Sequence, residues 1–153
     1  MSITTTTHLN FRGDARKALE FYQSVFGGQT TITTYGDFGM PKDVPGADNV
    51  VFGQLEADNG FRVMAYDIPG APANPAATST RRENGVTITD QPFFVSVRGT
   101  SLEEVQAYWD KLAVGASIIE PLAASAWSPG FGMLTDSFGV TWILDVAAEH
   151  NAS

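Results

Sequence analysis

His8 is the residue of this sequence with the clearest potential for chemistry, because an imidazole can contact a ligand or transfer a proton near neutral pH. In the segment THLNF, Leu9 and Phe11 alternate with His8 and Asn10. A period of two is typical of a half-buried strand, so we expect Leu9 and Phe11 to face a core and the other two to face the opposite side. His8 is therefore the candidate catalytic residue; the alternative is a neutral, hydrogen-bonded histidine at a strand end.

The same alternation predicts further side chains for a shared pocket. Most are apolar or aromatic, with a few polar groups among them, which is the usual lining of a small-molecule site. The alternative, for each taken alone, is that it fills the core. We expect Trp127, in the loop AASAWSPG, to close over an opening of the pocket. The candidate ligand-binding residues are His8, Asn10, Phe52, Gln54, Met64, Tyr66, Phe94, Trp127, Met133 and Ile143.

Several chemistries are not expected from the residue types. The chain has no cysteine, which removes disulfides, thiolate metal sites and cysteine nucleophiles. It has 2 histidines, and the second, His150, lies in the C-terminal tail AAEHNAS. An iron site of two histidines and one carboxylate would need both, so iron-dependent chemistry is not expected. No cofactor is predicted.

Composition predicts one compact domain without nucleic-acid or membrane partners. The chain has 153 residues, 43% of them hydrophobic and 17% charged, which is enough to bury a core. Its 9 basic and 17 acidic side chains give a net charge of −8, which opposes nonspecific binding to nucleic acids or anionic lipids. The start shows no signal-peptide pattern and no apolar run suits a membrane span, so we expect a cytoplasmic protein.

Two segments of the sequence occur twice. FGQLEADNG, residues 52–60, returns as FGMLTDSFG, residues 131–139. FRGDARKALEFYQSVFGG, residues 11–28, is similar to VRGTSLEEVQAYWDKLAVG, residues 97–115. Two such similarities in the same order indicate two modules.

Each module is predicted to contain a strand, a helix and three further strands. Asp14 is a plausible N-cap of the first helix, and Gly27 with Gly28 ends it. Ser101 and Glu104 suggest a capping box for the second. The expected apolar stripes are Ala18, Leu19, Tyr22, Val25 and Phe26 in the first helix and Val105, Tyr108 and Leu112 in the second. Strand-like runs follow around 29–35, 49–57, 61–67, 116–120, 131–136 and 139–147.

The predicted fold class is therefore α+β with two βαβββ modules in a single domain, residues 1–153. Module one spans about 1–67 and module two about 89–148. Residues 68–88, rich in Pro, Ala, Gly, Ser and Thr, are interpreted as a linker. The Gly- and Pro-rich loop 36–49 is either a lid or a disordered excursion.

The paired modules, the opening LNFRGDARKALEFYQSVFGG and the closing FGMLTDSFGVTWILDV resemble the vicinal oxygen chelate superfamily of glyoxalase, bleomycin-resistance and dioxygenase proteins. Within it they are most similar to the PhnB-like subgroup, often labelled 3-demethylubiquinone methyltransferase-like. The resemblance covers nearly the whole chain. It implies a glyoxalase-like sheet cavity shared by the two modules, and a homodimer.

Metal-dependent members of this superfamily hold a divalent ion with His and Glu side chains from both modules. By this resemblance the ligand positions fall near Thr6 or Thr7, near Pro92 or Phe93, and near Met64 and Ile143. None of these residues is a strong ligand for a divalent ion. Many PhnB-like relatives also have a histidine where this chain has Phe52. The resemblance therefore implies a protein without a metal.

The leading hypothesis is a metal-free protein that binds a small apolar or aromatic compound, for example to sequester it. The alternative is a lyase- or isomerase-type enzyme, either assisted by His8 as general base or using a metal held by unexpected ligands such as His8, Glu56 or Glu120. A third possibility is a vestigial cavity in a protein that acts through its surface.

Overall fold

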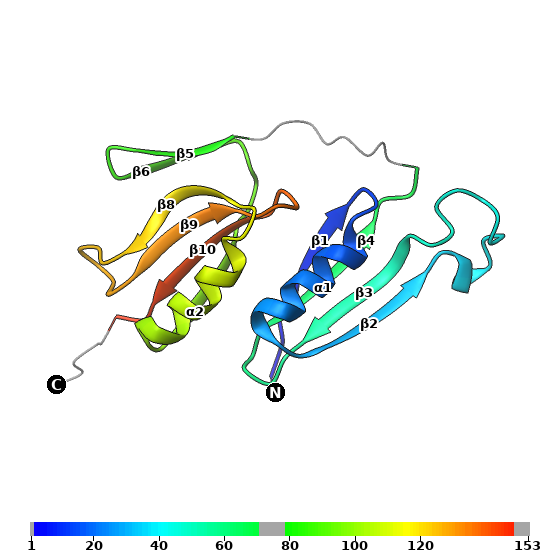
Figure 1. Cartoon of the computed structure of the whole chain (residues 1–153), viewed down its shortest axis with the longest axis horizontal. Helices are drawn as coiled ribbons and strands as arrows, with labels where there is room; N and C mark the ends of the chain where they lie inside the picture. The colour runs from blue at the N-terminus through cyan, green and yellow to red at the C-terminus, as the bar shows by residue number, and fades with distance from the viewer. Residues whose placement is uncertain (1, 71–78, 149–153) are drawn as a thin grey trace. The chain divides into compact units, whose positions relative to one another are not determined.

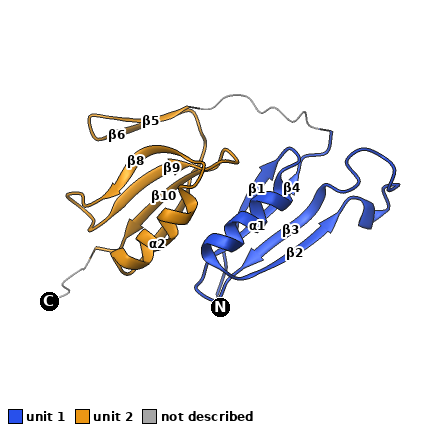
Figure 2. Cartoon of the chain, viewed as in Figure 1, with its two compact units in different colours: residues 1–76 blue, residues 77–153 orange. Residues whose placement is uncertain are grey.

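The computed structural model describes residues 2–70 and 79–148 (Figure 1). The chain divides into two compact units, residues 1–76 and 77–153 (Figure 2). His150 lies outside the described residues. No helix among the described residues is both long and apolar enough to cross a membrane.

The first unit is a four-stranded sheet with one helix packed on it. The strand order is β1-β4-β3-β2, with β1 parallel to β4 and the other neighbours antiparallel. Its elements are β1 (Thr7–Phe11), α1 (Ala15–Phe26), β2 (Gln29–Thr34), the short 3-10 helix η1 (Gly36–Phe38), β3 (Val50–Glu56) and β4 (Arg62–Asp67).

The second unit repeats this arrangement and adds a hairpin before it (Figure 1). The order of its main sheet is β7-β10-β9-β8, again with one parallel pair, β7 with β10. Its elements are β5 (Thr80–Glu83), β6 (Val86–Thr89), β7 (Val95–Gly99), α2 (Leu102–Leu112), β8 (Ser117–Ala123), β9 (Phe131–Thr135) and β10 (Thr141–Val146). The prediction of an α+β fold with two βαβββ modules is confirmed.

The repeated Phe-Gly-x-Leu motif is explained by how each helix meets its sheet. Gly53 and Gly132 lie buried in β3 and β9. A Cβ atom on Gly53 would come within 2.6 Å of Leu19 Cδ1, and one on Gly132 within 2.7 Å of Trp109 Cζ3. Both distances are shorter than real Cβ contacts allow, so the missing side chain is what lets a helix residue seat on the strand.

The apolar stripe of α2 differs from the predicted one at one position. The buried residues of α2 are Val105, Trp109 and Leu112, whereas Tyr108 is only half-buried. The prediction chose Tyr108 because it aligns with Tyr22 of the first helix. Spacings of four and three residues both lie on one helix face, and the space above Gly132 accommodates the larger indole ring of Trp109.

The start of α1 is held by a residue distant in sequence. Asp14 occupies the N-cap position, but its side chain makes no capping hydrogen bond. Instead the buried Asp67 carboxylate accepts hydrogen bonds from the Gly13 and Ala15 amides through Oδ1, at 2.8 and 3.0 Å, and from the Val50 amide through Oδ2, at 2.8 Å. The predicted cap of the second helix is present, since Ser101 Oγ accepts from the Glu104 amide at 3.2 Å.

The segment predicted as a linker, residues 68–88, contains regular structure. Its C-terminal part forms the β5–β6 hairpin, in which Glu83 pairs with Val86 across a turn at Asn84 and Gly85. Both turn residues have positive φ angles, 52° and 76°, as an Asn-Gly hairpin turn requires. The Asn-Gly pair indicates such a hairpin in the sequence. The two short strands were not predicted because the segment around them is polar.

The loop 36–49 begins with η1 and is tied at its base. The Tyr35 amide donates to the Asn49 carbonyl at 3.0 Å, and the Gly36 amide donates to the Ala47 carbonyl at 2.8 Å. Ala47 is buried, with 3% of its surface exposed. The base of the loop is thus an ordered part of the first unit.

Alanine at Gly53 or Gly132 should destabilise the protein by about 1 to 3 kcal/mol, because the added methyl group overpacks the helix–sheet contact. Urea unfolding of each variant would measure this. Ser96→Ala, on an exposed position of β7, is the control and should stay within about 0.5 kcal/mol of the parent. An unchanged unfolding midpoint for Gly53→Ala would contradict the packing argument.

Asp67→Asn should cost about 1.5 to 3 kcal/mol, because it weakens buried hydrogen bonds to a charged carboxylate. Asp14→Asn removes the same charge from the predicted cap, whose side chain makes no capping bond, and should change stability by less than about 0.5 kcal/mol. Thermal or urea unfolding compares the two. Equal losses would show that Asp67 does not hold the start of α1.

Candidate functional site

Six of the predicted residues lie on one face of the first sheet, opposite α1. Their alternation with buried residues and the strand register establish this: His8 pairs with Met64, Met64 pairs with Gln54, and Asn10 pairs with Tyr66. Phe52 is 37% exposed, and the remaining five are half-buried or exposed. We call this surface the open face; it consists of His8, Asn10, Phe52, Gln54, Met64 and Tyr66.

The His8 ring is fixed by two neighbours on the open face. Its Nδ1 atom lies 3.0 Å from Asn10 Oδ1, and its ring meets the Tyr66 ring edge to face, with centroids 5.3 Å apart and planes at 68°. An amide oxygen only accepts hydrogen bonds, so Nδ1 carries the proton and donates it. In the neutral imidazole Nε2 is then a hydrogen-bond acceptor.

Charged groups border the open face as a pair. Arg62 Nη2 lies 2.8 Å from Glu56 Oε1, and Gln54 Nε2 donates to Glu56 Oε2 at 3.2 Å. The pair joins neighbouring strands, because Glu56 and Arg62 are register partners. The positive charge of Arg62 is therefore balanced locally.

Tyr35 lies next to the open face and was not among the predicted site residues. Its hydroxyl donates to the Asp67 carbonyl at 2.7 Å. Burial, and to a lesser degree the neighbouring Tyr66 and Asp67 groups, raise the pKa of the Tyr35 hydroxyl above its usual 10.0. Sequence alone gave no signal for this residue, since the contact joins β4 to the residue after β2.

The corresponding face of the second sheet is covered by the β5–β6 hairpin and its C-terminal extension. Thr87 Oγ1 donates to Met133 Sδ at 3.6 Å, and Gln91 Nε2 donates to Thr141 Oγ1 at 2.8 Å. The Arg82 guanidinium lies over the Phe131 ring, 5.3 Å from its centroid.

Met133, one of the predicted ligand-binding residues, is thus buried under the hairpin within the second unit. Met133 is 0% exposed because the hairpin, assigned to a linker by the sequence, lies on it. Ile143 pairs with Met133 and with Ser96 and is half-buried, as is Phe94 just before β7.

Trp127 belongs to the second unit. It is 56% exposed and meets the Phe131 ring edge to face, with centroids 5.4 Å apart. The structure groups it with a groove beside the start of α2, lined by Thr100–Leu102, residues 124–129 and residues 146–148. No other predicted ligand-binding residue lines this groove.

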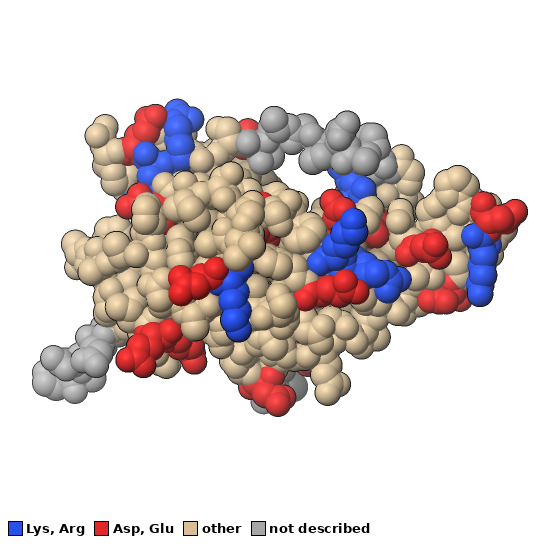
Figure 3. Space-filling view, viewed as in Figure 1, with Lys and Arg blue, Asp and Glu red and all other residues tan. Residues whose placement is uncertain are grey.

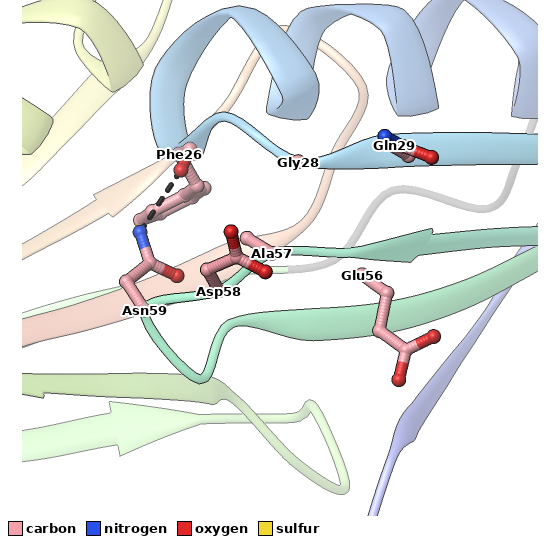
Figure 4. A pocket seen from close by; sticks show the side chains of 7 residues that line it. All are labelled: Phe26, Gly28, Gln29, Glu56, Ala57, Asp58 and Asn59. Atoms are coloured by element: carbon pink, nitrogen blue, oxygen red, sulfur yellow. Dashed lines mark hydrogen bonds between the residues drawn. The ribbon is translucent and has the colours of Figure 1, made fainter.

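A second depression lies at the end of α1 beside the β3–β4 turn (Figure 4). Asn59 Nδ2 donates to the Phe26 carbonyl there at 2.9 Å. In Figure 4 the carboxylates of Glu56 and Asp58 do not converge on one point. None of the predicted ligand-binding residues lines it. It therefore offers no arrangement for the predicted chemistry.

The residues at the expected metal positions do not fit a divalent ion. Thr7 pairs with the fully buried Val63, so the β1 residue beside Met64 on the open face is His8, one position later than predicted. The β7 residue beside Ile143 is Ser96. Among the described residues no three His, Asp or Glu side chains come together to hold a metal. A single imidazole with a thioether is a poor site for a hard divalent cation.

On the face of the molecule shown in Figure 3, basic side chains are interspersed with acidic ones. A surface of mixed charge does not provide the continuous positive stripe that binds a nucleic-acid backbone. This agrees with the net charge of −8.

Together these features describe a protein of two βαβββ units in which one sheet presents a partly apolar face around a single histidine. The sequence model of the Glyoxalase/Bleomycin resistance protein/Dioxygenase superfamily matches residues 6–144. The chain belongs to this superfamily.

Individual relatives agree with this assignment. The chain is 26% identical to Protein YjdN of Escherichia coli over 149 residues, 93% of this chain and 94% of the relative. Among solved structures it is similar to protein PA1353 from Pseudomonas aeruginosa, with 26% identity, a TM-score of 0.75 and coverage of 97% and 100% of the two chains. It is also similar to the PhnB protein from Bacillus cereus, with 28% identity, a TM-score of 0.68 and coverage of 95% and 100%. The resemblance to PhnB-like proteins is thus confirmed.

The raised pKa of Tyr35 gives a testable pH dependence. Folding favours the neutral hydroxyl, so its contribution to stability is present below pH 10.0 and is lost as the pH rises through the higher folded-state pKa. Absorbance titration of the parent and Tyr35→Phe should assign to Tyr35 a transition above pH 10.0. The difference in their unfolding free energies should shrink over the same range. A Tyr35 transition at or below the usual value would contradict the assignment.

Proposed function

We propose that the protein binds a small apolar or aromatic compound on the open face of the first sheet, without a metal ion. The observation that carries this proposal is the exposure of Phe52 beside Met64 and Tyr66 on a sheet whose other face packs against α1. Apolar side chains with a few fixed polar groups are the usual lining of ligand sites.

The contrast between the two units supports this location. The second sheet's corresponding face is occupied by the β5–β6 hairpin, which buries Met133 completely. The first sheet has no such cover among the described residues of its own unit. Membership of a superfamily that includes bleomycin-resistance proteins is consistent with sequestration of a small compound.

A direct test uses anisole, a neutral aromatic ether, titrated into isotope-labelled full-length protein and followed by NMR chemical shifts. We expect shifts at the open face and saturable binding. Phe52→Ser should weaken binding about three- to tenfold, because it removes part of the apolar contact area. Phe38→Ser is the matched control, since Phe38 is 72% exposed on η1 in the same unit, and it should leave the affinity unchanged.

Two results would contradict the proposal. One is an absence of saturable shifts at the open face, or equal effects of the Phe52 and Phe38 substitutions. The other is a stoichiometric divalent metal found by native mass spectrometry and elemental analysis in protein purified without chelator or affinity metal. The second result would direct mutagenesis to His8 and the neighbouring Glu56 as ligands.

A second candidate function is an enzyme in which His8 transfers a proton. The hydrogen bond from His8 Nδ1 to Asn10 favours it, because it leaves Nε2 as the basic atom. If turnover of a substrate is found, His8→Ala should abolish it, whereas unchanged turnover would remove this role. Homodimerisation stays a prediction from the family resemblance, which light scattering after gel filtration would check.

A further inference from the structure

We infer that the compound bound on the open face carries a hydroxyl group on an aromatic ring, as a phenol does; this inference rests on the proposed function. It specifies a functional group of the ligand, whereas the exposed apolar side chains alone indicate only that the ligand is apolar or aromatic. Three properties of the open face lead to it: an oriented acceptor, the pairing of Arg62 with Glu56 at its border, and apolar side chains beside the acceptor.

The oriented acceptor is Nε2 of His8. Asn10 Oδ1 accepts a hydrogen bond from Nδ1 at 3.0 Å, and a neutral imidazole has only one N–H group. Tyr66 packs against the ring with the two planes at 68°, and this contact together with the Asn10 hydrogen bond favours one orientation of the ring. A ligand group that meets Nε2 must therefore donate a hydrogen bond.

Among neutral aromatic compounds, a phenol supplies such a donor. Its hydroxyl group donates to Nε2 of His8, whereas an ether can only accept and a hydrocarbon can do neither.

The charge of the surroundings favours a neutral ligand over an aromatic acid. Arg62, the arginine that borders the open face, is paired with Glu56 at 2.8 Å. The chain as a whole carries a net charge of −8, which repels anions. A carboxylate would also present only acceptors to Nε2, which is itself an acceptor.

The apolar side chains of the open face explain why we expect the ligand to contain an aromatic ring. Met64 lies beside His8 in the neighbouring strand, and Tyr66 lies beside Asn10. Sulfur and aromatic side chains form favourable contacts with an aromatic ring. His8 and Asn10 thus lie next to the side chains on which the aromatic ring of a ligand would pack.

The test compares phenol, anisole and benzoate by NMR titration of the full-length protein at pH 8. Anisole is the larger and more apolar molecule, so hydrophobic burial alone would favour it over phenol. We expect phenol to bind about two- to tenfold more tightly than anisole, the value of one net hydrogen bond, and benzoate to bind more weakly than both.

His8→Phe keeps a ring at this position and removes the acceptor. It should lower the phenol-to-anisole preference to about one while retaining anisole binding. His8→Gln offers an amide oxygen and should retain part of the preference. Phe38→Ser should change neither affinity. Amide spectra of each variant verify that it is folded, which is expected because His8 is exposed.

The outcomes separate this inference from the proposed function. Equal binding of phenol and anisole, or a preference that persists in His8→Phe, overturns the hydroxyl inference and leaves aromatic binding standing. Binding of neither compound overturns both. Tighter binding of benzoate than phenol also overturns the inference, since it would show that the site selects an anion.

Discussion

The Asp67 carboxylate is the interaction on which the first unit depends. It lies at the end of β4 and accepts hydrogen bonds from backbone amides at the start of α1 and at the start of β3, while its carbonyl accepts from Tyr35. One buried charge thus satisfies three amides that would otherwise lack partners, which is a strong condition on where these segments can lie. Because β4 also carries Met64 and Tyr66, the same constraint fixes the strand beside which His8 and Asn10 must pair.

The two units pack helix against sheet in the same way but differ on the opposite face of the sheet. In each, a glycine at the same place of the repeated motif lets a helix side chain seat on the sheet, Leu19 on Gly53 and Trp109 on Gly132. The opposite faces differ, because only the second unit carries the hairpin. There the Thr87 hydroxyl contacts Met133, and the Arg82 guanidinium lies over the Phe131 ring. Among the described residues, the hairpin thus covers part of this face in the second unit, whereas the first unit has no hairpin on its corresponding face.

The local patterns in the sequence predicted the strands, the helices and the open face of the first unit, because alternation and helical periodicity are set by short-range geometry. They did not predict contacts that depend on distant residues. Asp14 was predicted as the N-cap of α1, but its side chain makes no capping bond. The amide at the start of the helix donates instead to Asp67, which is distant in sequence. The apolar stripe of α2 was predicted to include Tyr108, which aligns with Tyr22. The buried residue is Trp109, because its ring fits the space left by Gly132. The resemblance placed the first expected metal position near Thr6 or Thr7, whereas the β1 residue that pairs with Met64 is His8. A change of one residue along a strand changes the face of the sheet.

The surroundings of His8 bear on whether this scaffold would hold a metal or, as we propose, an organic group. In metal sites a histidine ligand donates its other ring N–H to a neighbouring carbonyl or carboxylate, which fixes the tautomer and directs the free nitrogen. The His8–Asn10 pair has this arrangement, but its neighbour across the strands is Met64 rather than a carboxylate. A directed nitrogen without further anionic ligands binds a divalent cation weakly, whereas it remains a good acceptor for a neutral hydroxyl. On our proposal, an oriented imidazole whose neighbour across the strands is not a carboxylate selects a neutral hydroxyl group rather than a divalent cation, on a fold that the superfamily shares.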